Sequence, residues 1–256
     1  MTALLEARGV TKRFGGLAAV SDVSCSVEEG AITAVIGPNG AGKTTFFNCI
    51  TAVAPPTSGE ILFDGRRIDA MKPHEVTRLG MARTFQNIRL FRQMTALENV
   101  ITARHCRTHS GVVASLLRLP SMRAEERRSI GLAEELLDFV GLAHWRDVNA
   151  ASLPYGDQRR LEIARAMATE PRLLLLDEPA AGMNPKESQD LVQLIRGISA
   201  RGITVVLIEH HMKVVMGIST HVVVLDHGEK IADGAPNAVR CDPAVIEAYL
   251  GREDVD

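Results

Sequence analysis

The chain has 256 residues, of which 46% are hydrophobic and 23% charged, with a formal net charge of −2. This length and balance suit one large α/β domain, or one domain with an insert, and they exclude a disordered chain. Because Lys and Arg are not in excess, the composition also argues against nucleic acid as the main partner.

Alternating apolar runs and longer helical patterns predict an α/β fold, with a largely parallel sheet and helices on its faces. Strands are expected, in chain order, over residues 4–10, 19–27, 31–36, 60–63, 172–177, 203–208 and 221–226. Helices are expected over residues 44–53, 95–103, 112–119, 123–140 and 185–200. The first two strands should pair antiparallel around Gly15 and Gly16, and Asp64-Gly65 should turn a hairpin.

The strand signal disappears between about Phe91 and Asp157, where helical patterns are separated by Gly111, Pro120 and Gly141. A helical subdomain is therefore expected to interrupt the core. The predicted division is a core over 1–90 and 158–240 that includes the antiparallel strands, a helical subdomain over 91–157, and a C-terminal tail over 241–256. The end of the tail, residues 251–256, is expected to fray.

The cysteines do not indicate a metal cluster, and the apolar runs do not indicate a membrane span. Cys25, Cys49, Cys106 and Cys241 are scattered, which predicts incidental thiols in a reducing compartment. The first residues lack the pattern of a secretory signal, and no window approaches the ~18 apolar residues of a span. We expect a soluble protein whose membrane function, if any, depends on a partner.

A phosphate-binding motif stands between a predicted strand and a predicted helix. The run Gly-Pro-Asn-Gly-Ala-Gly-Lys-Thr-Thr matches the GxxxxGK[ST] loop. Glycines let backbone N–H groups point at phosphate oxygens, and the helix N-terminus adds its positive dipole end. Lys43 supplies a cation for the β- and γ-phosphates, and the Thr44 hydroxyl is a ligand for Mg²⁺. The residues expected to bind ATP are Gly37, Pro38, Asn39, Gly40, Ala41, Gly42, Lys43, Thr44 and Thr45.

A second motif is the apolar run over residues 173–176 that ends in Asp177 and Glu178. Asp177 emerges at the end of a buried strand, where ligands bind in open parallel sheets, and is expected to hold Mg²⁺ directly or through water. Glu178 is placed to polarise the attacking water, a general-base role typically worth ~10²–10⁴ in rate.

Kinases, GTPases and DNA motors share these two motifs, but the chain resembles the ATP-binding cassette (ABC) family over nearly its whole length. The resemblance implies that Phe14 stacks on adenine, that Gln86 contacts Mg²⁺ and water, and that His210 contacts the γ-phosphate. Phe14 has an alternative reading as a core residue of the first hairpin. Outside the family pattern, a lone Gln such as Gln86 is more often a surface residue than a site residue, and a lone His after a strand, such as His210, is equally often either. Residues 180–184 match the loop that crosses the dimer interface.

The resemblance also identifies the family's signature motif, at the start of a helix whose N-terminus faces the γ-phosphate bound by the opposite subunit. Its residues are Leu153, Pro154, Tyr155, Gly156 and Asp157. The usual motif begins Leu-Ser-Gly-Gly-Gln, so Pro154 removes a serine hydroxyl and a backbone N–H, and a weakened contact is expected. His211 replaces the aspartate that commonly follows the histidine.

Residues 153–167, 177–185 and 208–219 resemble the ATP-binding subunit of branched-chain amino acid importers, and residues 104–129 resemble that subfamily's insertion. The resemblance implies a head-to-tail pair with a second ABC ATPase subunit, as a heterodimer or homodimer. The pair would lie under transmembrane permease subunits on the cytoplasmic face of the inner membrane. A binding protein outside the membrane would supply the solute.

Other functions stay open at this point. The ATPase does not touch the solute, so urea, amides, another solute or an exporter role are alternatives. A non-transport ABC ATPase fits less well, because repair relatives carry coiled-coil inserts and ribosomal relatives carry two cassettes. A small-molecule kinase would leave the signature motif, Gln86 and His210 unexplained.

Overall fold

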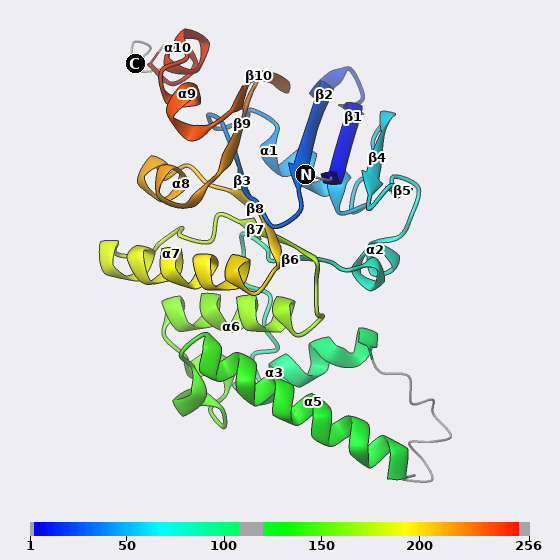
Figure 1. Ribbon diagram of the computed structural model, residues 1–256, viewed down its shortest axis with the longest axis vertical. Helices are drawn as coiled ribbons and strands as arrows, with labels where there is room; N and C mark the ends of the chain where they lie inside the picture. Colours follow the sequence, from blue (N-terminus) through cyan, green and yellow to red (C-terminus); the bar gives the residue numbers. More distant parts are fainter. Residues whose placement is uncertain (1–2, 108–119, 251–256) are drawn as a thin grey trace. The chain divides into compact units, whose positions relative to one another are not determined.

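The computed structural model describes residues 3–107 and 120–250, and the chain divides into two compact units. The first unit comprises Met1–Arg83 and Arg172–Asp256, and the second comprises Thr84–Pro171 (Figure 1). The helix predicted over 112–119 and the tail predicted to fray at 251–256 lie outside the described residues. The helical subdomain expected over 91–157 falls within the range of the second unit.

The first unit contains a six-stranded sheet in the order β10-β9-β3-β8-β7-β6. These strands are β3 (Ile32–Ile36), β6 (Met81–Arg83), β7 (Leu173–Asp177), β8 (Thr204–Ile208), β9 (His221–Asp226) and β10 (Glu229–Gly234). All neighbours pair parallel except β9 and β10. Every residue of β3, β7 and β8 is buried, as expected of apolar runs covered on both faces.

A second sheet in this unit is antiparallel, in the order β2-β1-β4-β5. Its strands are β1 (Ala3–Phe14), β2 (Leu17–Glu28), β4 (Ser58–Phe63) and β5 (Arg66–Arg67). The two hairpins predicted from the sequence are therefore present. Asp64 and Gly65 both have positive φ, 53° and 71°, which suits an Asp-Gly hairpin turn.

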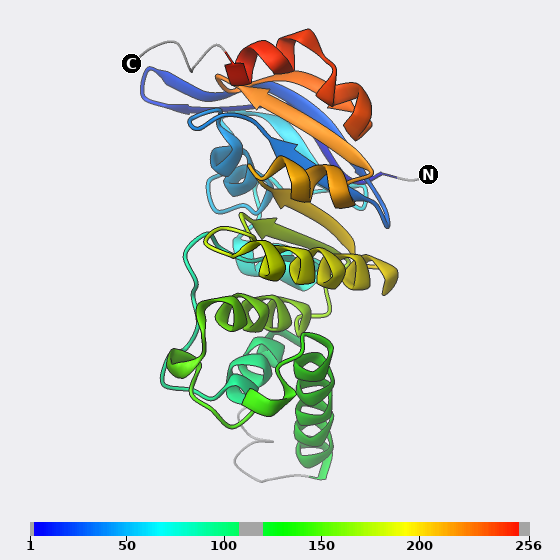
Figure 2. The ribbon, with the colours of Figure 1, turned by 90° about the vertical axis from the view of Figure 1, so that its left-hand side faces the viewer.

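Helix α1 (Lys43–Ile50) packs between the two sheets of the first unit, on the opposite face of the six-stranded sheet from α8 (Met212–Ile218) (Figures 1 and 2). Its Phe46, Phe47 and Ile50 join strand residues of both sheets in one buried cluster. Helix α7 (Pro185–Ala200) begins where predicted, because Asn184 accepts hydrogen bonds from the backbone N–H groups of Lys186 and Glu187. The core therefore holds α1, and the loop before it, in place.

Several short elements were not predicted from the sequence. They are α2 (Pro73–Leu79), α9 (Pro236–Arg240), α10 (Pro243–Leu250), α8, β6 and β10. Helix α1 also ends at Ile50, earlier than the predicted Val53, because Ala52 takes a left-handed conformation with φ of 56°. Each of these six elements has three to eight residues, which is too few for a helical or strand period to be read.

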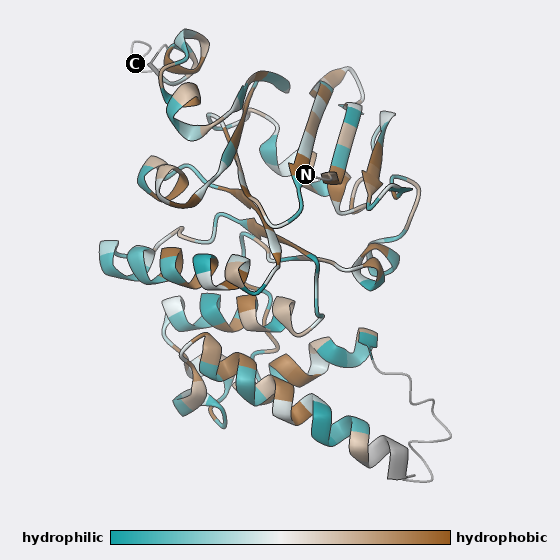
Figure 3. Ribbon diagram, in the orientation of Figure 1, coloured by the Kyte–Doolittle hydropathy of each residue, from teal (hydrophilic) through white to brown (hydrophobic). Residues whose placement is uncertain are grey.

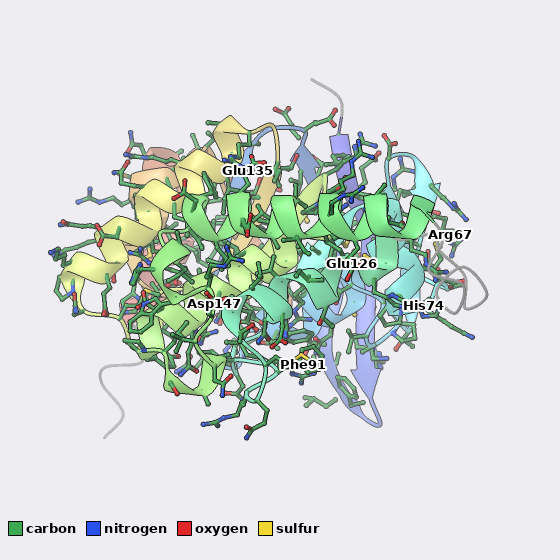
Figure 4. The ribbon with its side chains drawn as sticks, turned by 90° about the horizontal axis from the view of Figure 1, so that it is seen from below. Arg67, His74, Phe91, Glu126, Glu135 and Asp147 are labelled. Atoms are coloured by element: carbon green, nitrogen blue, oxygen red, sulfur yellow. The ribbon has the colours of Figure 1, made fainter. Side chains whose placement is uncertain are left out.

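The second unit is helical among its described residues. It contains α3 (Ala96–Ala103), α5 (Pro120–Phe139) and α6 (Tyr155–Met167), with short 3₁₀ turns at Arg104–Arg107, Ala143–Trp145 and Ala150–Ser152. Helix α5 buries Leu136 and Leu137 while Glu126 and Glu135 are exposed (Figure 4). Hydrophilic residues recur along it (Figure 3), and none of the helices within 3–107 and 120–250 is long and apolar enough to cross a membrane.

Candidate nucleotide-binding site

Three neighbouring parallel strands of the first unit each end in one of the predicted motifs. Val35 of β3 pairs with Ile208 of β8, and Ile208 pairs with Asp177 of β7. The phosphate loop, the His210 segment and the Asp177–Glu178 pair therefore leave the sheet at the same edge. This edge, beyond the carboxyl ends of the strands, is where open parallel sheets bind ligands.

Two glycines of the phosphate loop have backbone positions that exclude a side chain. Gly37 has φ of 147°, and a Cβ there would lie 2.0 Å from the Leu225 carbonyl oxygen. Gly42 has φ of 94°, and a Cβ there would lie 2.3 Å from the Ala19 carbonyl oxygen. The loop is therefore packed tightly against the neighbouring backbone.

Lys43 is the first residue of α1 and is buried. Its Nζ donates hydrogen bonds to the carbonyl oxygens of Gly37 and Pro38, at 2.7 and 2.9 Å. The ammonium thus folds back over the loop, at the N-terminus of the helix. An anion that enters the loop meets both this cation and the positive end of the helix dipole.

Asp177 is 2% exposed and forms an ion pair with Arg83 of β6, in which a guanidinium nitrogen lies 2.7 Å from its Oδ2. Arg83 also donates to Asn48 Oδ1 at 2.7 Å and to Thr51 Oγ1 at 3.2 Å, both near the end of α1. Sequence reasoning missed Arg83, because β6 has only three residues and carries no motif of its own. The pair joins the predicted metal ligand to the helix that follows the phosphate loop.

Glu178 is a non-glycine residue with a positive φ of 46°. Its backbone N–H donates to the Ile208 carbonyl at 3.0 Å, and its Oε1 lies 4.0 Å from Nδ1 of the half-exposed His210. Backbone conformations of this kind cost free energy and concentrate at functional sites. The predicted general base and the predicted γ-phosphate contact therefore lie together.

Phe14 ends β1 and is 55% exposed, with the Lys12 ammonium 5.3 Å from its ring centroid. This exposure excludes the alternative reading of Phe14 as a core residue of the hairpin. An exposed aromatic ring can stack on a nucleotide base.

The donor set at the sheet edge fits Mg²⁺. This ion prefers oxygen ligands and keeps several waters. Thr44, the second residue of α1, offers a hydroxyl, and Asp177 offers a carboxylate at the end of β7. Gln86, the third predicted ligand, belongs to the second unit.

In the second unit, the segment that contains Gln86 is held by two buried residues of α6. Arg159 donates to the Phe85 carbonyl at 2.8 Å and to the Gln86 carbonyl. Glu162 accepts from the backbone N–H groups of Phe85 and Arg89. Burial raises the pKa of Glu162, while those N–H donors and Arg159 oppose the shift. The three-residue spacing of Arg159 and Glu162 is the one signal in the sequence that points to this pair.

The signature residues lie where the resemblance places them, at the start of α6, with Pro154 as the residue before its first turn. Asp157 accepts a hydrogen bond from Trp145 Nε1 at 3.1 Å, and Gln158 Nε2 donates to the Leu153 carbonyl at 2.8 Å. Tyr155 is 47% exposed.

A surface pocket in the second unit adjoins both of its motifs. Gln86, Leu90, Arg92, Tyr155 and Gln158 are among the residues that line it.

The family model described as ABC transporter matches residues 20–181. The chain belongs to the ABC transporter family. A second model, described as branched-chain amino acid ATP-binding cassette transporter, matches residues 229–255. The predicted P-loop cassette fold is confirmed, and the protein is an ABC-type ATPase that binds nucleotide.

Relatives of this cassette match it over nearly full length. The high-affinity branched-chain amino acid transport ATP-binding protein BraF of Pseudomonas aeruginosa is 50% identical, with 97% of this chain and 98% of that protein covered. The corresponding LivG of Escherichia coli K12 is 45% identical over the same shares. A solved ABC transporter cassette in its ADP conformation has 32% identity and a TM-score of 0.85, covering 98% of this chain and all of that one.

Proposed function

We propose that this cassette is the ATP-hydrolysing subunit of an importer of branched-chain amino acids, working with a separate permease. The observation that carries the proposal is the 50% identity to BraF across 97% of the chain. The ATPase subunit does not contact the solute, and the permease determines which solute is transported. Similarity confined to the phosphate loop would therefore say little about the solute. Here the likeness extends to residues 229–255, far beyond the nucleotide motifs.

The proposed partners are transmembrane permease subunits and a second ABC ATPase subunit, as a heterodimer or homodimer. We propose that the complex lies at the cytoplasmic face of the inner membrane and that a binding protein acts on it only indirectly. The pocket lined by Gln86, Leu90, Tyr155 and Gln158 is proposed as a contact for the permease. It adjoins the segment expected to sense nucleotide, which suits a surface that passes motion on.

In the proposed mechanism, one ATP lies against Phe14 and residues 37–45 of this chain, and the partner's signature motif closes over it. Lys43 and the N-terminus of α1 bind the phosphates. Thr44, Asp177 and Gln86 are proposed to hold Mg²⁺, which when bound neutralises charge on the β- and γ-phosphates.

Glu178 takes the proton of the attacking water in this mechanism, and His210 contacts the γ-phosphate. The 4.0 Å between their side chains allows both to act on one phosphate. Because the γ-phosphate is bound by both subunits, ATP favours the closed pair, and hydrolysis releases it.

Labelled uptake tests the proposal. Cells with and without this chain are offered leucine, isoleucine, valine, urea and an unrelated sugar. We expect loss of branched-chain amino acid uptake, restored by the wild type and not by Glu178→Gln. Normal amino acid uptake with loss of urea uptake would keep the motor and reject the cargo. Normal uptake of every solute would reject the importer role.

A further inference from the structure

Glu209 is a fully buried carboxylate beside the nucleotide site that no motif explains. It directly follows β8, and its side chain is 0% exposed. Its Oε1 accepts a hydrogen bond from the backbone N–H of Ala180 at 2.9 Å. Its Oε2 accepts from the backbone N–H groups of His210 and His211, both at 3.2 Å. One side chain therefore connects the loop after β7 to the loop after β8.

The same carboxylate also orients the two histidine rings. Nδ1 of His211 lies 3.3 Å from Glu209 Oε2. The His211 ring stands 4.3 Å from the His210 ring, measured between centroids, at an interplanar angle of 36°. Glu209 thus contacts the backbone of His210 directly and its ring through His211.

Burying a carboxylate is unfavourable unless its oxygens are well hydrogen-bonded. Three backbone N–H groups and a histidine satisfy this one, and hydrogen bonds to a charged acceptor are stronger than neutral ones. Glu209, His210 and His211 do place possible metal-ligand atoms within 4.8 Å of one another. Both carboxylate oxygens already accept backbone N–H groups, however, which favours a structural link over a metal site.

We propose that Glu209 is a positioning residue, which ties the loop after Glu178 to the histidine pair and so sets where His210 lies relative to Glu178. This inference rests on the proposed function. Ala180 is two residues from Glu178, and the turn is closed by hydrogen bonds from the Ala181 N–H to the Glu178 carbonyl and from the Met183 N–H to the Ala180 carbonyl. A displacement of this loop pulls on Glu209 and thereby on His210.

Within one chain, Glu209 connects the loop after Glu178 to His210, the proposed γ-phosphate contact. The family resemblance implies that residues 180–184 lie at the dimer interface, so we expect movement of a partner subunit there to reach His210 through Glu209. A second cassette would then affect hydrolysis without touching the phosphate loop of this one.

Amide hydrogen exchange on the full chain, followed by NMR, tests the link directly. Glu209→Gln keeps only one acceptor oxygen, so at least one of the two loops loses its contact. We expect exchange at Ala180, or at His210 and His211, to become about tenfold faster or more. The control is Glu187→Gln, which makes the same charge change. Glu187 accepts a hydrogen bond from the Asn184 N–H, at the other end of the loop. Unchanged exchange at all three amides in Glu209→Gln, or equal acceleration in the control, would overturn the link.

ATP hydrolysis in membranes that contain the complete transporter tests whether the link acts through His210. We expect Glu209→Gln to lower kcat at least tenfold with unchanged ATP affinity. The double variant with His210→Ala should be no slower than His210→Ala alone, because groups that act as a unit are not additive. Fully additive losses would show a general structural effect and overturn the inference. If His210→Ala hydrolyses normally while the amides respond to Glu209→Gln, the proposed role of His210 fails and the physical link stands.

Discussion

The guanidinium of Arg83 lies 2.7 Å from the Asp177 carboxylate, and the two side chains are 7% and 2% exposed. They are 94 residues apart in the chain and come together because β6 pairs with β7. Since Arg83 also binds Asn48 and Thr51, it fixes the predicted metal ligand against the far end of α1.

Replacing Arg83 by Met should destabilise the protein by about 3–5 kcal/mol, because the buried Asp177 carboxylate loses its ion pair with Arg83. Urea unfolding without nucleotide measures the effect. Arg83→Met with Asp177→Asn should recover part of the loss, since no charge remains buried. The matched control is Arg67→Met, which removes a 61% exposed side chain from its ion pair with Asp69 and should change stability little. Equal stability of the two Arg→Met variants would contradict the prediction.

Lys43→Ala should weaken ATP binding roughly tenfold to a hundredfold. Lys43 is the only Lys or Arg among residues 37–45, so this variant removes the cation of the phosphate loop. Equilibrium binding to the purified chain measures this. Lys72→Ala, at an exposed lysine before α2, serves as the control and should bind normally. Unchanged ATP affinity in Lys43→Ala would count against the proposed phosphate site.

Glu178→Gln should reduce ATP hydrolysis by about 10²-fold or more while sparing ATP binding, since the amide cannot take a proton from water. Single-turnover hydrolysis and nucleotide binding are measured on the same sample. Glu187→Gln removes the same charge nearby and should hydrolyse ATP like the wild type. Wild-type-like turnover in Glu178→Gln would reject its role as the general base.

Gly42→Ala should distort the phosphate loop, because its Cβ would lie 2.3 Å from the Ala19 carbonyl oxygen and its φ is 94°. We expect a large loss of ATP affinity and lower stability, both measurable by binding and by thermal unfolding. At Gly16 φ is not positive and a Cβ would meet nothing within 4 Å, so Gly16→Ala is the control. A Gly42→Ala protein that binds ATP as Gly16→Ala does would show that the loop is looser than described.

Iodoacetamide should modify Cys241 much faster than Cys49 at pH 8. Burial raises the pKa of the Cys49 thiol to about 11, so only a small fraction is thiolate, whereas Cys241 is exposed. Mass spectrometry of digested protein over time measures both sites. Rapid labelling of Cys49 in the folded chain would mean that α1 opens readily.

Much of the first unit was predictable because its signals are local. Strands β3, β7 and β8 are short apolar runs. The pair Asn184-Pro185 predicts the start of α7, because Asn184 caps the helix and Pro185 is its first residue. The positions of Lys43, Asp177 and Glu178 at one sheet edge followed from the parallel topology. Their individual roles stay predictions.

What the sequence did not reveal depends on contacts between distant segments. Arg83 and Glu209 look like ordinary charged residues in the chain, and only the fold shows that their side chains are 7% and 0% exposed and paired. The hold of Arg159 and Glu162 on the Gln86 segment spans more than 70 residues, beyond the reach of any periodic pattern.

Arg159 and Glu162 lie on α6, the helix that begins with Tyr155, Gly156 and Asp157. They bind the backbone of the Gln86 segment, through two carbonyls and two N–H groups. The signature motif and the Gln86 segment are therefore both attached to helix α6. We therefore expect a rotation of α6 to move the signature motif and the Gln86 segment together.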